Sequence, residues 1–435
     1  MLFQQIQYKK CTELDDDKCI PGILEDYVGL ANPGSWGAGL YYTSINGKVL
    51  GEMKVEQNQF NRWRMIHAGV IDTIGLMIKE LPDSKKYTAE QTIKACSEYQ
   101  TTDKKAEFDK LKSLTVNTIA QDGLTMNQVQ TRTLSVFQPG YRHDAMVAFP
   151  TTNKYCIYDT KLNVDDQINA PLPNPQPQLA PGNPLNAQLI GWVNVNASKL
   201  KQQTAAQYLK DQAQKMGLSK EIQTQLSQHN LSAFTDHASL MTAEVDKVIE
   251  NRPQQFSALS LSFGPGGIKF GFRHIKEDVS PPTIPPISFG DFFDGEGAVE
   301  GEYVRQLQIG KIDEWELTSD LAGHPFHIHV NPFQIVKILK TVGDKEIDVS
   351  DTAPDPNDNN LDDVQYRGLK GQFKDTIFVK QGYRVIVRSH YKKFEGDFVQ
   401  HCHILDHEDQ GMMETVRVCG GKFPCNSPLP TSSHH

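Results

Sequence analysis

The chain has 435 residues, a formal net charge of −9 at pH 7 and a pI of about 5.9. Its length is enough for two or three domains, and its acidic balance argues against a surface that binds nucleic acid. No apolar run approaches the roughly 18 residues that a membrane helix requires, so we expect neither nucleic acid nor membrane among its partners.

Residues 1–164 are expected to form a β domain. The first eight residues, Met-Leu-Phe-Gln-Gln-Ile-Gln-Tyr, alternate as a strand does and lack the basic and apolar regions of a signal peptide. Asn46 and Gly47 separate two alternating runs within 41–55, and an Asn-Gly pair in that position predicts a β-hairpin.

A helical interruption is expected at about 83–113. Thr88 and Gln91 have the spacing of a capping box, in which each side chain bonds the backbone N–H of the other residue. Lys and Glu dominate the residues that follow, and we expect one or two exposed helices inserted into the sheet.

Two further segments precede the C-terminal part of the chain. Residues 165–197 contain six prolines between Pro171 and Pro184, which block both helix and ladder and predict an extended linker. Residues 198–253 are predicted to form a helical insertion with Ser198 and Ser219 as N-caps. This insertion is either structural or a lid over a functional site.

Residues 254–425 return to many short strands with turns between them, which is typical of an antiparallel sandwich. Residues 426–435 form a tail. Its last two histidines are interpreted as the stub of an affinity tag and are left out of the metal-site prediction.

Residues 401–412, His-Cys-His-Ile-Leu-Asp-His-Glu-Asp-Gln-Gly-Met, hold one thiol, three imidazoles and a thioether. A thiolate with two imidazoles and a long, weak thioether contact is the ligand set of a blue copper site. Cys402, His407 and Met412 can supply three of these ligands, and His324 can supply the second imidazole.

A second group of imidazoles is expected beside this site. Residues i and i+2 of a strand point to the same face, so His327 and His329 share one face. His401 and His403 also share a face, with Cys402 between them on the opposite side. This arrangement suits one-electron entry at Cys402 and multi-electron chemistry at metals that the four histidines hold.

The pattern His-Pro-x-His-x-His followed by His-Cys-His-x3-His-x4-Met resembles the C-terminal copper motifs of the multicopper oxidases, the laccases and their relatives. The spacing of so many metal-binding side chains makes the resemblance specific. It implies an all-β fold of two cupredoxin-like Greek-key β-sandwiches with helical insertions. Residues 1–164 resemble the family's middle domain, and residues 254–425 resemble its copper-bearing C-terminal domain.

The resemblance also implies roles for individual residues. The implied ligands are His324, Cys402, His407 and Met412 for type 1 copper, His327 for type 2 copper, and His329, His401 and His403 for type 3 coppers. Glu408 matches an acidic position of bacterial relatives and is expected to donate or relay protons, while Cys402 is expected to conduct electrons. The implied substrates are dioxygen and a small reductant such as a phenol, an aminophenol or a metal ion.

The chain has only two His-x-His pairs, 327/329 and 401/403, whereas the family's trinuclear cluster uses four. The other two pairs belong to an N-terminal domain that is expected to be missing here, so the trinuclear site is expected to be incomplete in this chain. Truncation is the favoured interpretation, with self-association or an N-terminal-domain partner as a consequence. A second chain could instead complete the cluster, or the protein could use only its type 1 site.

The sequence therefore favours a laccase-like multicopper oxidase with an incomplete trinuclear site. The alternative is a mononuclear blue-copper electron-transfer or copper-binding protein that does not reduce oxygen. Copper stoichiometry and the visible spectrum separate the two.

The chain has seven cysteines. With Cys402 assigned to copper, an even number remains, which is compatible with disulfides in an oxidising compartment. The six remaining residues are Cys11, Cys19, Cys96, Cys156, Cys419 and Cys425, of which the first two and the last two enclose short loops. The pairing stays open, and family habit suggests a periplasmic or secreted protein.

Overall fold

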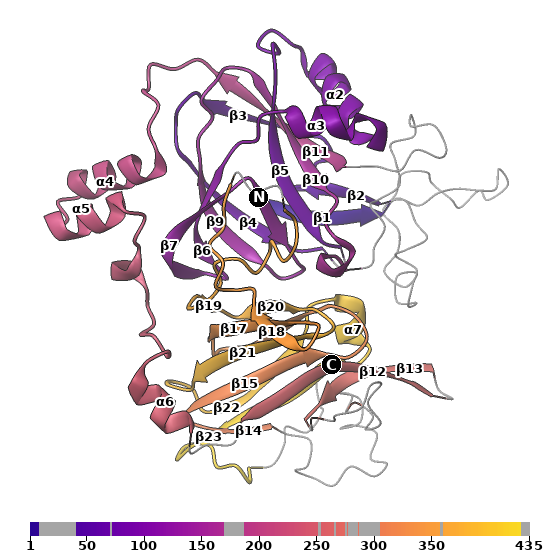
Figure 1. Ribbon diagram of the computed structural model, residues 1–435, viewed down its shortest axis with the longest axis vertical. Helices are drawn as coiled ribbons and strands as arrows, with labels where there is room; N and C mark the ends of the chain where they lie inside the picture. The colour runs from indigo at the N-terminus through magenta and orange to yellow at the C-terminus, as the bar shows by residue number, and fades with distance from the viewer. Residues whose placement is uncertain are drawn as a thin grey trace. The chain divides into compact units, whose positions relative to one another are not determined.

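The computed structural model describes residues 1–7, 41–69, 72–168, 187–250, 254–264, 267–274, 276, 286, 305–356 and 360–427. Within these residues the chain is mostly β, with four sheets and a few helices (Figure 1). It divides into two compact units, Met1–Thr235 with Pro354–Gln365, and Asp236–Ala353 with Tyr366–His435. The predicted β class with helical insertions is confirmed.

The first unit has a six-stranded sheet of order β2-β1-β4-β9-β6-β7 and a five-stranded sheet of order β3-β11-β10-β5-β8. Its strands are β1 (Leu2–Gln7), β2 (Tyr41–Ile45), β3 (Gly51–Glu56), β4 (Asn61–His67), β5 (Ile74–Leu81), β6 (Val116–Gln121), β7 (Leu124–Arg132), β8 (Leu134–Phe137), β9 (Arg142–Val147), β10 (Lys154–Thr160) and β11 (Ala187–Asn196). Phe3 on β1 packs against Phe137 on β8 with ring centroids 5.6 Å apart. Side chains of the two sheets therefore meet in a shared core.

The turn at Asn46 and Gly47 forms, but its flanking strands enter different sheets. Both turn residues have positive φ, as a two-residue hairpin turn requires, and two backbone hydrogen bonds of 2.9 and 3.1 Å close the turn. β2 then pairs with β1, whereas β3 pairs with β11. The predicted hairpin over 41–55 is therefore wrong, because Leu50, which also has positive φ, redirects the chain after the turn.

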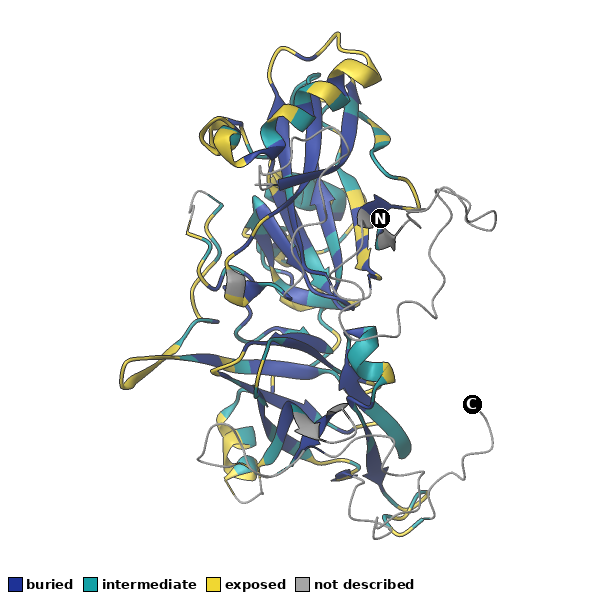
Figure 2. Ribbon diagram, turned by 90° about the vertical axis from the view of Figure 1, so that its right-hand side faces the viewer, coloured by how far each residue is buried: buried dark blue, intermediate teal, exposed yellow. Residues whose placement is uncertain are grey.

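The predicted interruption at 83–113 contains α2 (Ala89–Ser97) and α3 (Lys105–Lys110). The capping box is confirmed, since the Gln91 N–H donates to Thr88 Oγ1 and the Thr88 N–H donates to Gln91 Oε1. Figure 2 shows much of this region as exposed, in contrast to the buried strands.

The predicted linker over 165–197 is wrong for its last ten residues. β11 occupies 187–196 and pairs with both β10 and β3. No proline follows Pro184 in this segment, so each residue of β11 keeps the backbone N–H that a ladder needs. The proline-rich stretch itself, 169–186, lies outside the described residues.

The predicted helical insertion over 198–253 does contain helices. They are α4 (Ala205–Lys215), α5 (Lys220–Ser227) and α6 (Ala243–Ile249). Ser219 caps α5 as predicted, whereas Thr204 rather than Ser198 caps α4. None of the helices that the described residues form has the length and apolar character of a membrane span.

The insertion does not form one body. Leu226 of α5 packs with Val129 of β7 in the first unit, whereas the N–H of Leu240 donates to Gln334 of the second unit at 2.6 Å. The boundary between the units accordingly falls at Asp236, ahead of the predicted start of the C-terminal domain at 254. The lid role stays a prediction.

The second unit has a seven-stranded sheet of order β13-β12-β15-β21-β17-β18, with β19 beside β17, and a five-stranded sheet of order β14-β23-β22-β16-β20. Its strands are β12 (Gln255–Gly264), β13 (Gly267–Arg273), β14 (Arg305–Gln308), β15 (Ile312–Ser319), β16 (His324–Ile328), β17 (Phe333–Val342), β18 (Lys345–Asp348), β19 (Phe373–Lys374), β20 (Thr376–Val379), β21 (Tyr383–His390), β22 (Gly396–Cys402) and β23 (Met413–Cys419). Phe326 on β16 packs against Phe333 on β17 with ring centroids 6.1 Å apart. The second unit therefore also has a core shared by two sheets.

Two disulfides join described residues, Cys96 to Cys156 and Cys419 to Cys425. The expectation of at least one disulfide is confirmed. Cys402 is a free, buried cysteine, as a metal ligand must be. Cys11 and Cys19, which enclose the other short loop noted in the sequence, lie outside the described residues.

Candidate metal centre

The two histidine motifs lie on neighbouring strands of the second unit. β16 and β22 are antiparallel partners, with Phe326 opposite Cys402 and His327 opposite His401. The His403 N–H extends this pairing by donating to the Pro325 carbonyl at 2.8 Å. Stretches more than 70 residues apart in sequence thus place their imidazoles beside one another on two interior strands of the five-stranded sheet.

The four residues predicted to hold type 1 copper come together in the core of the second unit. His324, Cys402 and Met412 are fully buried, and the ring centroids of His324 and His407 are 5.1 Å apart. The Cys402 N–H donates to the Met412 carbonyl at 3.0 Å, and the Met412 N–H donates to the His407 carbonyl at 2.8 Å. α7 (Leu405–Asp409) lies in this loop and brings His407 back toward the strand end.

These residues fit a copper ion on their own chemistry. Nε2 of His324 and Nδ1 of His407 are buried and have no hydrogen-bond partner, and an orphaned buried polar atom costs free energy that a ligand recovers. Burial lowers the pKa of His324 to about 4 and that of His407 to about 3. Both imidazoles are therefore neutral at pH 7, the form that binds metal.

Hydrogen bonds fix the orientation of the His324 ring. Nδ1 lies 2.8 Å from Ser319 Oγ and 3.1 Å from the Ala322 carbonyl, so the other ring nitrogen is left for a ligand. Cys402 Sγ accepts a hydrogen bond of 3.4 Å from the Ile404 N–H. Burial raises the pKa of the Cys402 thiol, which therefore holds its proton until a metal displaces it.

The four imidazoles of the His-x-His pairs form a second cluster. The His327 centroid lies 5.1 Å from His329, 5.2 Å from His401 and 5.6 Å from His403. Nε2 of His329 and Nε2 of His401 are 3.2 Å apart. Among the described residues, His327, His329 and His401 are the group of three metal-ligand side chains whose donor atoms lie within 4.8 Å of one another.

Hydrogen-bonding groups of the protein lie beside Nδ1 of His327 and His401 in this cluster. His327 Nδ1 lies 2.9 Å from both the Asp375 carbonyl and Thr376 Oγ1, and His401 Nδ1 lies 2.9 Å from the Cys402 carbonyl. This leaves Nε2 of both rings as the nitrogen that could bind a metal, as is usual for histidine ligands. His329 is exposed, so the cluster opens to the surface of the second unit.

Glu408, the predicted proton relay, lies beside the histidine cluster. Its Oε2 is 3.1 Å from His401 Nδ1. Burial acts to raise the pKa of Glu408, but the hydrogen bond and charge of His401, with the charges of His403 and His329, outweigh it and lower the pKa. Glu408 is therefore a carboxylate at neutral pH.

Sequence reasoning missed a buried polar network on the strand that carries the ligands. Gln400 Nε2 donates to Glu414 Oε2 at 2.7 Å and to Ser257 Oγ at 3.1 Å. Glu414 also pairs with Arg305 at 3.1 Å and with His274 at 2.9 Å. Gln400 directly precedes His401 in the sequence. Glu414 lies opposite Gln400 in the β22–β23 ladder. Charged residues in otherwise buried strands were the available signal.

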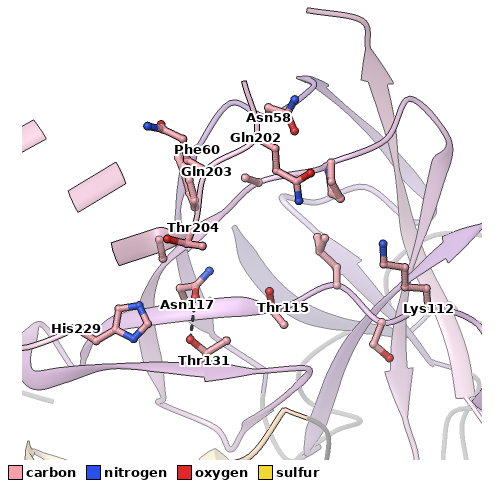
Figure 3. Close-up of a pocket in the computed structure, with 15 residues that line it drawn as sticks. Asn58, Phe60, Lys112, Thr115, Asn117, Thr131, Gln202, Gln203, Thr204 and His229 are labelled. Atoms are coloured by element: carbon pink, nitrogen blue, oxygen red, sulfur yellow. Dashed lines mark hydrogen bonds between the residues drawn. The ribbon is translucent and has the colours of Figure 1, made fainter. Parts of the chain in front are cut away.

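A pocket of about 400 Å³ in the first unit offers no second metal centre. Figure 3 shows its mostly neutral lining, with His229 directed toward Asn117 and Thr131 donating to Asn117 at 2.9 Å. Lys112 is the single charged residue and His229 the single imidazole of the lining.

Comparison with known proteins finds similarity in the C-terminal part of the chain. Residues 278–420 match the family model described as multicopper oxidase. Bilirubin oxidase of Albifimbria verrucaria is 29% identical over 133 residues, which are 30% of this chain and 19% of that protein. A laccase of Haloferax volcanii is 32% identical over 107 residues, which are 24% of this chain and 15% of that protein.

The fold of the chain is also similar to that of solved structures. A solved structure of the McoA multicopper oxidase from Aquifex aeolicus has a TM-score of 0.54 and 14% sequence identity. The alignment covers 96% of this chain and 64% of the McoA chain. The described architecture is therefore similar to the fold of that protein, and this chain spans less than two thirds of that protein's length.

Proposed function

We propose that this chain, whose residues 278–420 match the family model described as multicopper oxidase, belongs to that family and is a laccase-like oxidase. It takes single electrons from a small reductant at a type 1 copper and delivers them to a copper cluster that reduces dioxygen to water. One observation carries the proposal. His401 and His403 flank the buried thiol of Cys402, and their rings lie with His327 in one cluster.

Eight side chains would hold the copper ions. They are His324, Cys402, His407 and Met412 for type 1, His327 for type 2, and His329, His401 and His403 for type 3 copper. Copper bound at these positions supplies one-electron transfer and the binding of dioxygen. The residues fit because the first group is a buried thiol and thioether with two orphaned nitrogens, and the second is a cluster of four imidazoles.

The protein's own groups prepare these positions. Ser319, Asp375 and Thr376 fix the rings of His324 and His327 through hydrogen bonds to Nδ1, so little ordering is left for metal binding. The backbone between Cys402 and its flanking histidines is the shortest covalent route between the two sites. Glu408 Oε2, beside His401 Nδ1, is the acceptor and donor for protons that oxygen reduction consumes.

The cluster needs more imidazoles than this chain contributes. Four histidines cannot give three coppers the two or more nitrogen ligands that each is expected to need. The exposed position of His329 supports completion by ligands from outside the second unit, either a further domain or another chain.

The reductant is proposed to be a phenol, an aminophenol or a metal ion. Each unit is proposed to be a cupredoxin-like Greek-key sandwich, in agreement with its pair of sheets. A periplasmic or secreted location is proposed as well, and the two disulfides support it because disulfides persist in oxidising compartments.

Copper content together with the visible and EPR spectra of the purified, reconstituted chain tests the proposal. Intense blue absorption that Cys402→Ser abolishes is expected, with type 1 and type 2 EPR signals once the cluster is completed. Absorption that survives in Cys402→Ser would contradict the type 1 assignment.

A mononuclear electron-transfer protein is the second candidate, since His324, Cys402, His407 and Met412 all lie on this chain while the cluster is incomplete. A single type 1 signal with one copper per chain, unchanged by any added domain, would favour it. Oxygen consumption that His401→Ala abolishes while the blue colour stays would favour the oxidase.

A further inference from the structure

Phe270 covers one face of the His407 imidazole. The two ring centroids are 4.4 Å apart and the ring planes are inclined by 19°, which is a stacked arrangement. Phe270 itself is only 4% exposed, so its ring is held in place by surroundings on its other sides. No motif pointed to this residue, which stands in the alternating run Gly-Ile-Lys-Phe-Gly-Phe-Arg of β13.

The next inward aromatic residue on the same strand packs in the core instead of against a candidate copper ligand. Phe272 is fully buried and meets Phe326 edge to face, with centroids 6.4 Å apart. Residues i and i+2 of a strand share a face, so β13 supplies one ring to the core and one ring to the candidate copper ligand.

β13 lies at the edge of its sheet and pairs with β12 alone among the described strands. Phe270 therefore reaches His407 from a strand of the seven-stranded sheet, whereas His407 itself follows β22 of the other sheet. The stacking is a contact between the two sheets at the type 1 position and is not part of either hydrogen-bonded ladder.

We propose that Phe270 is a specificity-determining residue for the reductant, by occupying the face of His407 on which a flat donor would otherwise stack. This inference rests on the proposed function, in which electrons enter through the type 1 ligands. With His324 5.1 Å away and Phe270 over one face, a reductant would contact an edge of the His407 imidazole rather than the face that Phe270 covers.

This arrangement would favour one class of reductant over another. A small donor, or a phenol that presents its hydroxyl end-on, can contact an edge, whereas a fused planar aromatic donor cannot gain stacking energy. Stacked aromatic pairs contribute roughly 0.5–1.5 kcal/mol beyond their buried area, which is about a 2- to 12-fold change in affinity. Replacement of the Phe270 ring by the smaller leucine side chain widens the space beside the His407 imidazole, so a planar donor can approach that face more closely.

The first test uses the metal-free chain and does not depend on turnover. Phe270→Leu is compared with the matched control Phe272→Leu, which removes the same aromatic ring two residues away on the same strand. Each protein is treated with diethyl pyrocarbonate, and the modification rate of His407 is followed by peptide mass mapping. Melting temperatures check that both variants fold.

We expect His407 to be modified several-fold faster in Phe270→Leu and at the wild-type rate in Phe272→Leu. Equal rates in the wild type and Phe270→Leu would overturn the proposal, because the ring would then not cover the imidazole. An equal acceleration in both variants would also overturn it, since general loosening of β13 would explain the result.

The second test uses the copper-loaded protein, supplied with whatever completes its cluster. The ratio of kcat/KM for a fused-ring aminophenol to that for ferrocyanide is expected to rise about 2- to 12-fold in Phe270→Leu. An unchanged ratio would overturn the role in specificity while leaving the oxidase proposal intact. If the chain binds no copper, the oxidase proposal fails, and the first test still reports whether Phe270 shields His407.

Discussion

His327 and His401 are direct partners in the ladder of β16 and β22, with ring centroids 5.2 Å apart. Directly opposed residues of neighbouring strands point to the same face of a sheet, so this one register brings the two His-x-His pairs together. A slip of one residue would turn every side chain of β22 to the other face. The metal cluster therefore depends on the register as much as on the histidines.

His329→Ala is expected to separate the two candidate copper sites. His329 is exposed, so its loss leaves the core intact, and the blue absorption that depends on Cys402 stays at the wild-type level. Copper bound at the histidine cluster is expected to fall, which metal analysis and the type 2 EPR signal measure. A loss of blue colour in His329→Ala would contradict the separation of the two sites.

Much of this site could be predicted from the sequence because strand geometry has a fixed period. The side chains of His401 and His403 alternate with Cys402 in any extended backbone, so their division between two sites follows from spacing. The meeting of 324–329 with 401–407 required the pairing of two distant strands, and the resemblance to a family supplied it.

The remaining features depended on contacts that no local pattern encodes. Phe270 resembles an ordinary strand residue until the two sheets meet, and Glu414 resembles an exposed carboxylate until Arg305 is found 3.1 Å from it. The hairpin predicted at Asn46 failed for the same reason. The turn chemistry was correct, but the partners of the flanking strands are chosen by the whole fold.

Arg305→Met is expected to destabilise the second unit by about 3–5 kcal/mol, because it leaves the buried carboxylate of Glu414 without its charged partner. Arg305 and Glu414 have side chains only 6% and 3% exposed. Arg62→Met is the control, since Arg62 pairs with Asp144 but has a side chain 62% exposed, and such pairs contribute about 1 kcal/mol or less.

Scanning calorimetry measures both variants. Equal losses in Arg305→Met and Arg62→Met would show that burial of the pair does not matter. Gln400 shares the Glu414 carboxylate, so Arg305→Met is also expected to weaken copper retention at the adjacent His401.

Loss of the Cys96–Cys156 disulfide is expected to destabilise the first unit by about 4 kcal/mol. The bridge closes a loop with a sequence separation of 60 residues, and the loop-entropy relation gives about this value, against about 2 kcal/mol for a loop of seven residues. Cys419–Cys425, with a separation of 6, is the internal comparison.

The double variants Cys96→Ser/Cys156→Ser and Cys419→Ser/Cys425→Ser, unfolded in urea, measure the two effects. A larger loss from the short loop would show that local packing rather than loop closure sets the contribution of each disulfide.

A pair of buried carboxyl groups predicts an unusual pH dependence for the first unit. Burial raises the pKa of Asp159 to about 7, although the Gly75 N–H donates to its Oδ1 at 2.8 Å. Burial, with the charge of Asp159, also raises the pKa of Asp72. Oδ2 of each side chain is buried without a hydrogen-bond partner, so the backbone N–H that each Oδ1 accepts does not offset the effect of burial.

Because the folded-state pKa of Asp159 lies above its unfolded value of 3.8, the folded chain binds more protons between about pH 4 and pH 7. Its contribution to stability is therefore fully present below pH 4 and is lost as the pH rises to 7, by roughly 4 kcal/mol. Asp159→Asn is expected to remove this loss, since the amide carries no charge. Urea unfolding of both proteins at pH 5 and pH 8 measures the difference. A parallel pH dependence in Asp159→Asn and the wild type would mean that Asp159 stays ionised in the folded protein.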